Sequence, residues 1–197
     1  YLLDALLELL EARWNSADLD FAIALADALL AHFEDTAGGF FFTADDHEDL
    51  IQRPKPLDDD STPSGNGTAA HTLLRLGHLL GEPRYLEAAE RTLHLAWPHL
   101  KQMPYAHTTL LKALEEWLHP AETLVVRAEA DQLDAWRRQI PPGLAPRRFV
   151  VLIPNAETGL PGLLAERAPR SAGVAYLCSG THCSAPIHEP GALALLL

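Results

Sequence analysis

Apolar residues at helical spacing fill most of the first 120 residues, and this pattern constrains the fold more than any other feature of the chain. Over residues 3–29 they recur at three- and four-residue intervals, which places them on one helix face. A polar break at residues 15–18 divides this stretch into two helices, and Ser16 or Asp18 is expected to cap the second. Because the connection is short, we expect an antiparallel helix hairpin.

Three more helices are expected before residue 120. One begins after Ser64, a suitable N-cap, and ends at Gly81, a residue typical of helix C-termini. Proline suits the first turn of a helix, so Pro83 and Pro104 are expected to open the other two. Two helix pairs separated by a long loop favour a repeated two-helix unit.

The pattern changes after Pro120. Short apolar runs typical of strands now alternate with one amphipathic stretch. The predicted elements are strands at 123–127, 149–153 and 174–178 and a helix at 130–140. Strand, helix and strand at this spacing resemble a βαβ unit. The expected fold is therefore mainly α, with helix hairpins over residues 1–120 followed by a small α/β subdomain over residues 121–197.

Composition excludes several classes of function. The 27 acidic and 15 basic residues give a formal charge of −12, which disfavours binding to nucleic acid or to an anionic membrane. No apolar run approaches the roughly 18 residues of a membrane span. Tyr1 already lies inside an amphipathic pattern, so the chain is expected to be part of a longer protein. Two cysteines cannot form a disulfide framework, and a cytoplasmic location is the default expectation.

The loop between the two helix pairs is the strongest candidate for a functional site. It is long and polar, and Pro54 and Pro56 prevent a helix. Its cations, carboxylates and neutral polar groups suit a polyhydroxylated ligand. The candidate ligand-binding residues are Arg53, Lys55, Asp58, Ser64 and Asn66. A structural interpretation stays open, in which arginine and aspartate pair within the loop and Ser64 only caps its helix. The aspartates at 58–60 are also typical of a solvated acidic run.

Ten histidines offer further candidates for proton transfer. His71 and His78 are seven residues apart and share a helix face, yet an ordinary half-buried role is favoured for both. Tyr105 and His107 follow Pro104, and one or the other is expected to face the same cavity as the loop. Tyr105 is a further candidate ligand-binding residue. Asp58 and His107 are thus the candidate catalytic acid and base.

Cys178, His182, Cys183 and His188 are all zinc-ligand types within eleven residues. Their spacing differs from a C-x2-C knuckle, and no second cysteine pair exists, so no metal is expected. A disulfide or a redox role for Cys178 and Cys183 stays open, although ordinary packing in the tail is favoured.

The motifs Arg-Pro-Lys-Pro at 53–56 and Pro-Ser-Gly-Asn at 63–66 follow Gly-Gly-Phe-Phe-Phe-Thr at 38–43. Together with the C-x4-C pair at 178–183, they resemble the spermatogenesis-associated thioredoxin-domain family. The resemblance implies the last helix pairs of an α/α toroid similar to N-acylglucosamine 2-epimerases. It also implies a thioredoxin-like domain elsewhere in the full-length protein.

Two functions follow as expectations. The first is binding or processing of a carbohydrate or similar small polar ligand, with sugar isomerase, epimerase or glycosidase-like chemistry if the protein is an enzyme, and with no cofactor. The alternative is a non-catalytic toroid that works with the thioredoxin-like domain in redox or partner binding, with Cys178 and Cys183 as exchange partners. A purely structural interaction module is the third possibility. No reaction is transferred from the epimerases, because fold does not determine function.

Overall fold

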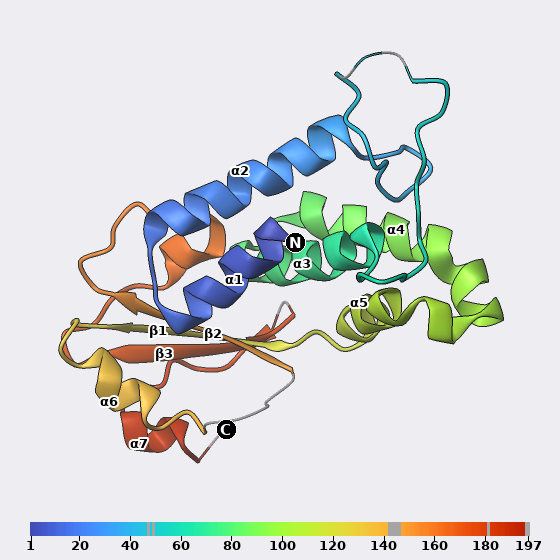
Figure 1. Cartoon of the computed structure of the whole chain (residues 1–197). Helices are drawn as coiled ribbons and strands as arrows, with labels where there is room; N and C mark the ends of the chain where they lie inside the picture. The colour runs from blue at the N-terminus through green and yellow to red at the C-terminus, as the bar shows by residue number, and fades with distance from the viewer. Residues whose placement is uncertain (47, 49, 142–146, 181, 196–197) are drawn as a thin grey trace.

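The computed structural model describes the chain except for residues 47, 49, 142–146, 181 and 196–197. It is mainly helical with one small mixed sheet (Figure 1), which confirms the expected fold class at that level. The first part contains α1 (Leu2–Ala12), α2 (Ser16–His32), α3 (Gly65–Leu80), α4 (Pro83–Gln102), η1 (Pro104–Ala106) and α5 (Thr108–Leu118). Within the described residues, no helix is both long and apolar enough to cross a membrane.

The second part begins with β1 four residues after α5 ends. Its elements are β1 (Glu122–Ala128), α6 (Leu133–Arg137), β2 (Arg148–Pro154), η2 (Gly162–Glu166), β3 (Val174–Ser179), β4 (His182–Cys183) and α7 (Pro190–Leu193). All three expected strands are present, and α6 is shorter than the expected helix at 130–140. The strands β1 and β2 are parallel with α6 in the crossover between them, so a βαβ unit is present.

Helix α3 is the centre of the helical part. It packs against α1, α4 and α5, and nearly all of its residues are buried. Both expected signals at its ends are confirmed. The Ser64 side chain accepts a hydrogen bond from the amide of Gly67 at 2.9 Å, and Gly81 ends the helix in the left-handed conformation with φ 66°.

Two helix starts differ from expectation. The cap of α2 is Asn15, whose side chain accepts from the amide of Ala17 at 3.1 Å, so the choice of Ser16 or Asp18 was wrong. Pro104 opens only the single turn η1, and α5 begins after a break at His107. The amide of Thr109, in the first turn of α5, donates instead to Asp59 from the distant loop at 2.9 Å.

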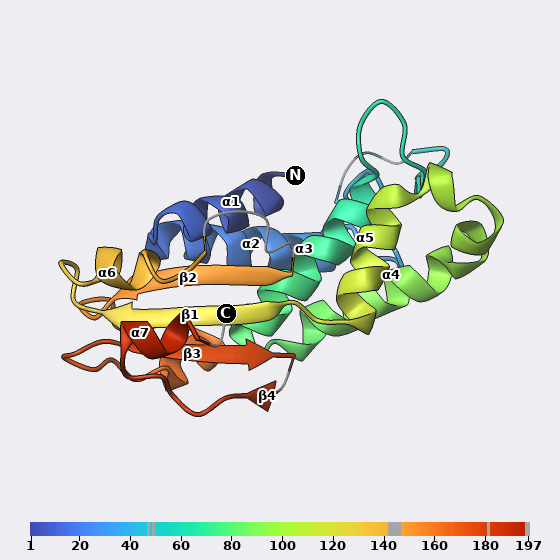
Figure 2. The same cartoon turned by 90° about the horizontal axis from the view of Figure 1, so that it is seen from below.

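The sheet has the strand order β2-β1-β3-β4, with β3 antiparallel to both of its neighbours (Figure 2). Figure 1 shows α1 and α2 on one side of the sheet and α6 and α7 on the other. Phe149 and Val151 pack into the helical core, whereas Leu124 and Val126 face Trp136 of α6. One face of the sheet therefore shares its core with the helices.

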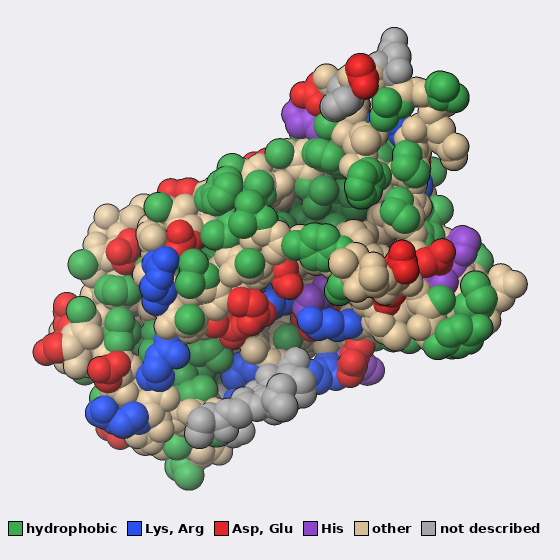
Figure 3. All heavy atoms as spheres, viewed as in Figure 1, with side chains coloured by type: hydrophobic (Ala, Val, Ile, Leu, Met, Phe, Trp, Pro, Cys, Tyr) green, Lys and Arg blue, Asp and Glu red, His purple; other side chains and the backbone are tan. Residues whose placement is uncertain are grey.

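A buried arginine joins the helices to the sheet. The Arg75 guanidinium contacts Glu8 at 2.6 Å and Glu11 at 2.8 Å, and it stacks over the ring of Phe149 at 4.7 Å. The other carboxylate oxygen of Glu11 accepts from the amide of Val150 in β2 at 2.8 Å. Burial raises the pKa of Glu11 despite these partners. In Figure 3, acidic and basic side chains gather between the helices and the sheet.

Candidate functional site

A cavity of 430 Å³ lies where the end of the loop meets α2 and the start of α3. Its apolar wall includes the rings of Phe40, Phe41 and Phe42, and hydrophobic side chains gather over this region in Figure 3. The polar residues in its lining are Asp58, Asp60, Thr62, Ser64 and Asn66. Three of the residues predicted to bind ligand, Asp58, Ser64 and Asn66, thus meet at one cavity.

Asp58 and His107, the two predicted catalytic candidates, are in contact. The Oδ1 atom of Asp58 lies 2.6 Å from Nε2 of His107. The imidazole is fully buried, whereas the carboxylate is 68% exposed and reaches the cavity. The pair therefore connects a proton-carrying group in the interior to an accessible carboxylate.

The hydrogen bonds of His107 limit where its protons can be. Its Nδ1 lies 2.8 Å from the carbonyl oxygen of Met103, which only accepts, so Nδ1 carries a proton. The contact between Asp58 Oδ1 and Nε2 has the distance of an ion pair without the alignment of a hydrogen bond. Nε2 is therefore the ring nitrogen that faces the accessible carboxylate.

Asp59 holds the loop in place, a role that the acidic run at 58–60 did not reveal. Its carboxylate accepts from the amide of Ser64 at 2.8 Å, the hydroxyl of Thr108 at 2.6 Å and the amide of Thr109 at 2.9 Å. Burial alone would raise the pKa of Asp59, but these hydrogen bonds outweigh it and lower the pKa to about 2. Asp59 is thus an anchored anion that sets the position of Asp58 beside it.

The two predicted cations have structural partners instead of facing the cavity. Arg53 donates to the carbonyl of Thr43 at 2.7 Å and stacks over Phe41 at 4.2 Å. Lys55 pairs with Asp35 at 2.7 Å and donates to the carbonyl of Gly38 at the same distance. The hydrogen bond from Lys55 lowers the pKa of Asp35. Neither cation is in the cavity lining.

Ser64 and Asn66 line the cavity and also have structural roles. Ser64 caps α3, and the Asn66 amide bridges three backbone groups. Its Oδ1 accepts from the amide of Phe40 at 2.6 Å, while its Nδ2 donates to the carbonyls of Phe40 and Pro56 at 3.0 and 2.8 Å. These bonds fix the aromatic wall against the loop and leave Asn66 little capacity for a ligand.

Three other candidate residues lie elsewhere. Tyr105 is 77% exposed and does not belong to the cavity lining. His71 and His78 lie on α3, and burial lowers the pKa of His78 and brings that of His71 to about 3. Both imidazoles are therefore neutral near pH 7; His78 is half-buried, as expected, whereas His71 is buried.

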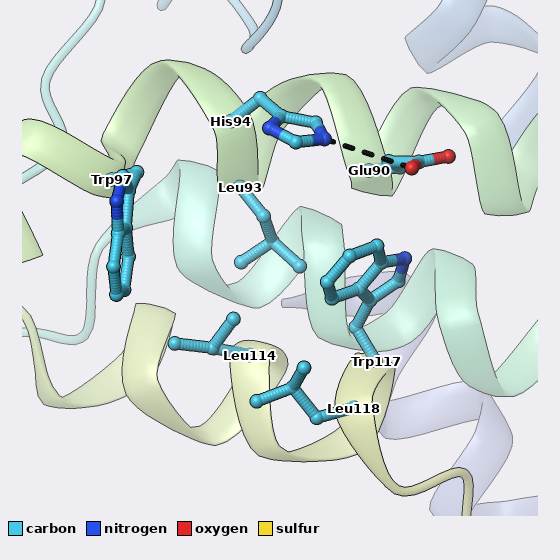
Figure 4. Close-up of a pocket in the computed structure, with 7 residues that line it drawn as sticks. All are labelled: Glu90, Leu93, His94, Trp97, Leu114, Trp117 and Leu118. Atoms are coloured by element: carbon cyan, nitrogen blue, oxygen red, sulfur yellow. Dashed lines mark ion pairs between the residues drawn. The ribbon is translucent and has the colours of Figure 1, made fainter.

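A second cavity of 290 Å³ lies between α4 and α5 (Figure 4). Its walls are almost entirely apolar, with Trp97 and Trp117 on facing helices. The polar groups are Glu90 and His94 on α4, 3.6 Å apart, and His94 meets the edge of Trp117. Trp97 is 47% exposed, so one aromatic wall of this cavity faces solvent.

The two cysteines form a disulfide across β3 and β4. The sequence left this bond open and favoured ordinary packing, a preference that is wrong. Cys178 is buried and Cys183 is exposed. The guanidinium of Arg167 contacts both sulfur atoms, at 3.3 and 3.2 Å.

Comparison with known proteins gives one consistent result, although no family model matches the chain. The chain is 27% identical over its whole length to spermatogenesis-associated protein 20 of Homo sapiens, 26% to that of Rattus norvegicus and 25% to that of Mus musculus. It spans about a quarter of these relatives' length, 26% in each case. This whole-length similarity confirms the resemblance of the chain to the spermatogenesis-associated protein family.

Proposed function

We propose that the 430 Å³ cavity binds a small polar ligand of the carbohydrate class, and that Asp58 with His107 exchanges a proton with it. One observation carries the proposal. Asp58 is exposed to the cavity while its Oδ1 lies 2.6 Å from Nε2 of a fully buried histidine. A base within reach of a ligand and linked to a second titratable group is the arrangement that general acid–base catalysis needs.

The cavity walls support a sugar. Rings such as those of Phe40–Phe42 can pack on the C–H face of a sugar, and carboxylates and hydroxyls can bind its hydroxyl groups. Asp58 and Asp60 both reach the lining, and among the described residues no lysine or arginine does. A neutral or amino sugar is therefore favoured over a sugar phosphate, because two carboxylates repel an anion.

The chemistry supported best is isomerisation or epimerisation. Removal of a proton from a carbon beside a carbonyl needs a base, and return of a proton needs an acid. Asp58 and His107 are two titratable groups in contact, so the pair can serve both steps.

The wider architecture belongs to the same proposal. In the full-length protein, α1–α5 would be the last helix pairs of an α/α toroid, and a thioredoxin-like domain would be a partner in the same chain. Both features come from the family resemblance. We place the protein in the cytoplasm, and we expect no nucleic acid, membrane or cofactor to take part.

The test uses the full-length protein and a panel of neutral sugars, amino sugars and sugar phosphates. Thermal shift detects a ligand that binds the folded state, because binding raises the melting temperature by mass action. Proton NMR in D2O then follows exchange of the hydrogen beside the sugar carbonyl. We expect a shift and exchange with a neutral or amino sugar, both lost in Asp58→Asn.

Asp60→Asn is the matched control. It removes the same charge from the same cavity, but among the described residues no imidazole lies within ion-pair distance of Asp60. We expect this variant to keep most of the binding and the exchange. A flat panel with folded protein refutes the ligand site, and binding without exchange in any sugar refutes the proton-transfer role alone.

A further inference from the structure

The Cys178–Cys183 disulfide lies at the edge of the sheet. It joins β3 to β4, and none of the residues that line the ligand cavity belongs to these two strands. It joins directly opposite residues of β3 and β4, and β4 is only two residues long. Cys183 is exposed, so a reductant in solution can reach its sulfur. Cys178 is only 7% exposed, so its sulfur is the protected member of the pair.

Arg167 is an unusual neighbour for a disulfide. Its Nη2 donates toward Sγ of Cys178 at 3.3 Å and toward Sγ of Cys183 at 3.2 Å, and its guanidinium lies over the ring of Tyr176 at 5.4 Å. In the part of the chain that the structure describes, no carboxylate lies within ion-pair distance of it. Disulfide sulfurs are weak acceptors, so this half-buried cation lacks a strong partner while the bond is intact.

Reduction of the disulfide would supply that partner. A thiolate is an anion, and a neighbouring arginine stabilises it relative to the thiol. Stabilising the reduced form makes a disulfide a better oxidant, which is the opposite of what a permanent structural bond needs. We propose that Cys178 and Cys183 form a thiol–disulfide exchange site for a dithiol reductant, with Arg167 as the residue that holds the leaving thiolate.

The exchange has two balanced steps. One thiolate of the dithiol attacks exposed Cys183 Sγ, the Cys178–Cys183 bond breaks, and Cys178 leaves as a thiolate beside Arg167. The second thiolate of the dithiol attacks the mixed disulfide, and Cys183 leaves. The dithiol is thereby oxidised to a disulfide, and its two electrons end on the sulfurs of Cys178 and Cys183. One of its protons ends on Cys183, and the other stays in solvent while Cys178 is held as a thiolate.

The experiment measures how easily the bond is reduced in the full-length protein. Samples equilibrate in defined ratios of reduced to oxidised dithiothreitol, free thiols are alkylated, and trypsin is added. Cleavage after Arg170 gives a peptide that begins at Ser171 and carries both cysteines, so other cysteines do not interfere. A second assay records the pH dependence of alkylation after full reduction.

Arg167→Met removes the charge, and Arg167→Lys keeps it. If the arginine stabilises the thiolate by one pKa unit, Arg167→Met needs an about tenfold higher dithiol ratio for half-reduction, or about 30 mV. The pH dependence of alkylation in Arg167→Met moves to higher pH. In Arg167→Lys, both the half-reduction ratio and the alkylation profile stay close to those of the unchanged protein. Arg170→Met is the control, since the structure gives that side chain no contact with either sulfur; its peptide begins at Ala168.

Two results overturn the proposal. One is an unchanged half-reduction ratio and alkylation profile in folded Arg167→Met, which would leave Arg167 with a packing role. The other is an equal change in Arg170→Met, which would mean that any nearby charge has the same effect. Neither assay depends on a ligand in the 430 Å³ cavity, so the outcome is independent of the sugar-site proposal.

Discussion

Asp59→Ala should release the loop from α5 and destabilise the chain. The carboxylate accepts one hydrogen bond from Ser64, five positions away, and two from Thr108 and Thr109, 49 and 50 positions away. Loss of a helix cap costs about 0.5–2 kcal/mol, and a hydrogen bond to a charged group contributes about 1.5–3 kcal/mol net. Because part of the site is solvated, we expect a loss of about 2–4 kcal/mol for alanine and less for asparagine, which keeps one acceptor oxygen.

The same residue predicts a dependence on acid. The pKa of Asp59 is lowered from 3.8 to about 2 in the folded chain, so the carboxylate contributes stability above pH 4 and loses it as pH falls toward 2. The shift corresponds to at most about 2.4 kcal/mol at 1.36 kcal/mol for each unit, and solvent screening reduces this to about 1–2 kcal/mol. Asp59→Asn should lack that part of the acid sensitivity.

Urea unfolding followed by circular dichroism at pH 7 and between pH 5 and 2.5 measures both effects. Asp60→Ala is the matched control, because its exposed side chain accepts no hydrogen bond in the described structure, and we expect a change within about 0.5 kcal/mol. If Asp59→Ala were as stable as Asp60→Ala, the anchoring role of Asp59 would be refuted.

Three further predictions concern the core and its junctions. The pKa of His71 falls from 6.5 to about 3 because burial disfavours the cation, so stability should decline by about 1.4 kcal/mol per pH unit between pH 6 and 4. His71→Gln should remove that slope in urea titrations, and an unchanged slope would contradict it. Arg75→Met should lower the free energy of unfolding by about 3 kcal/mol in thermal unfolding, because it leaves buried charge unpaired. Glu8→Gln should lower it by less than about 1 kcal/mol, because the Glu8 side chain is 62% exposed. Gly162→Ala should cost more than about 2 kcal/mol in urea, since its Cβ would lie 2.2 Å from a carbonyl oxygen of α3. Gly159→Ala has a similar φ but open space, so equal losses in the two variants would argue against the clash.

Local patterns were sufficient for the longer helices and three of the four strands, because each depends on residues close in sequence; the short elements β4, η2 and α7 were not predicted. These strands and most helices appear where periodicity predicts them, and Ser64 and Gly81 end α3 as expected. The cap of α2 was missed because three adjacent residues compete for it: Asn15 caps, while the Ser16 hydroxyl binds Glu157, 141 positions away.

The candidate site was predictable in location and less so in roles. A loop with prolines and mixed charges indicated the region, and Asp58 and His107 were named as separate candidates whose contact the sequence did not predict. The partners of Arg53 and Lys55 are largely backbone carbonyls, which no sequence pattern marks. Asp59 was indistinguishable from its acidic neighbours, because its partners on α5 come from a distant segment.

The shared core between helices and sheet has a consequence for dissecting this protein. Sequence patterns place a boundary near residue 120, but Phe149 and Val151 bury their side chains among the helices. A chain cut there would expose apolar surface on both pieces, and each would tend to aggregate. The tail is thus part of the scaffold on which the loop is built. Ligand or redox assays on either half alone would report on a damaged protein.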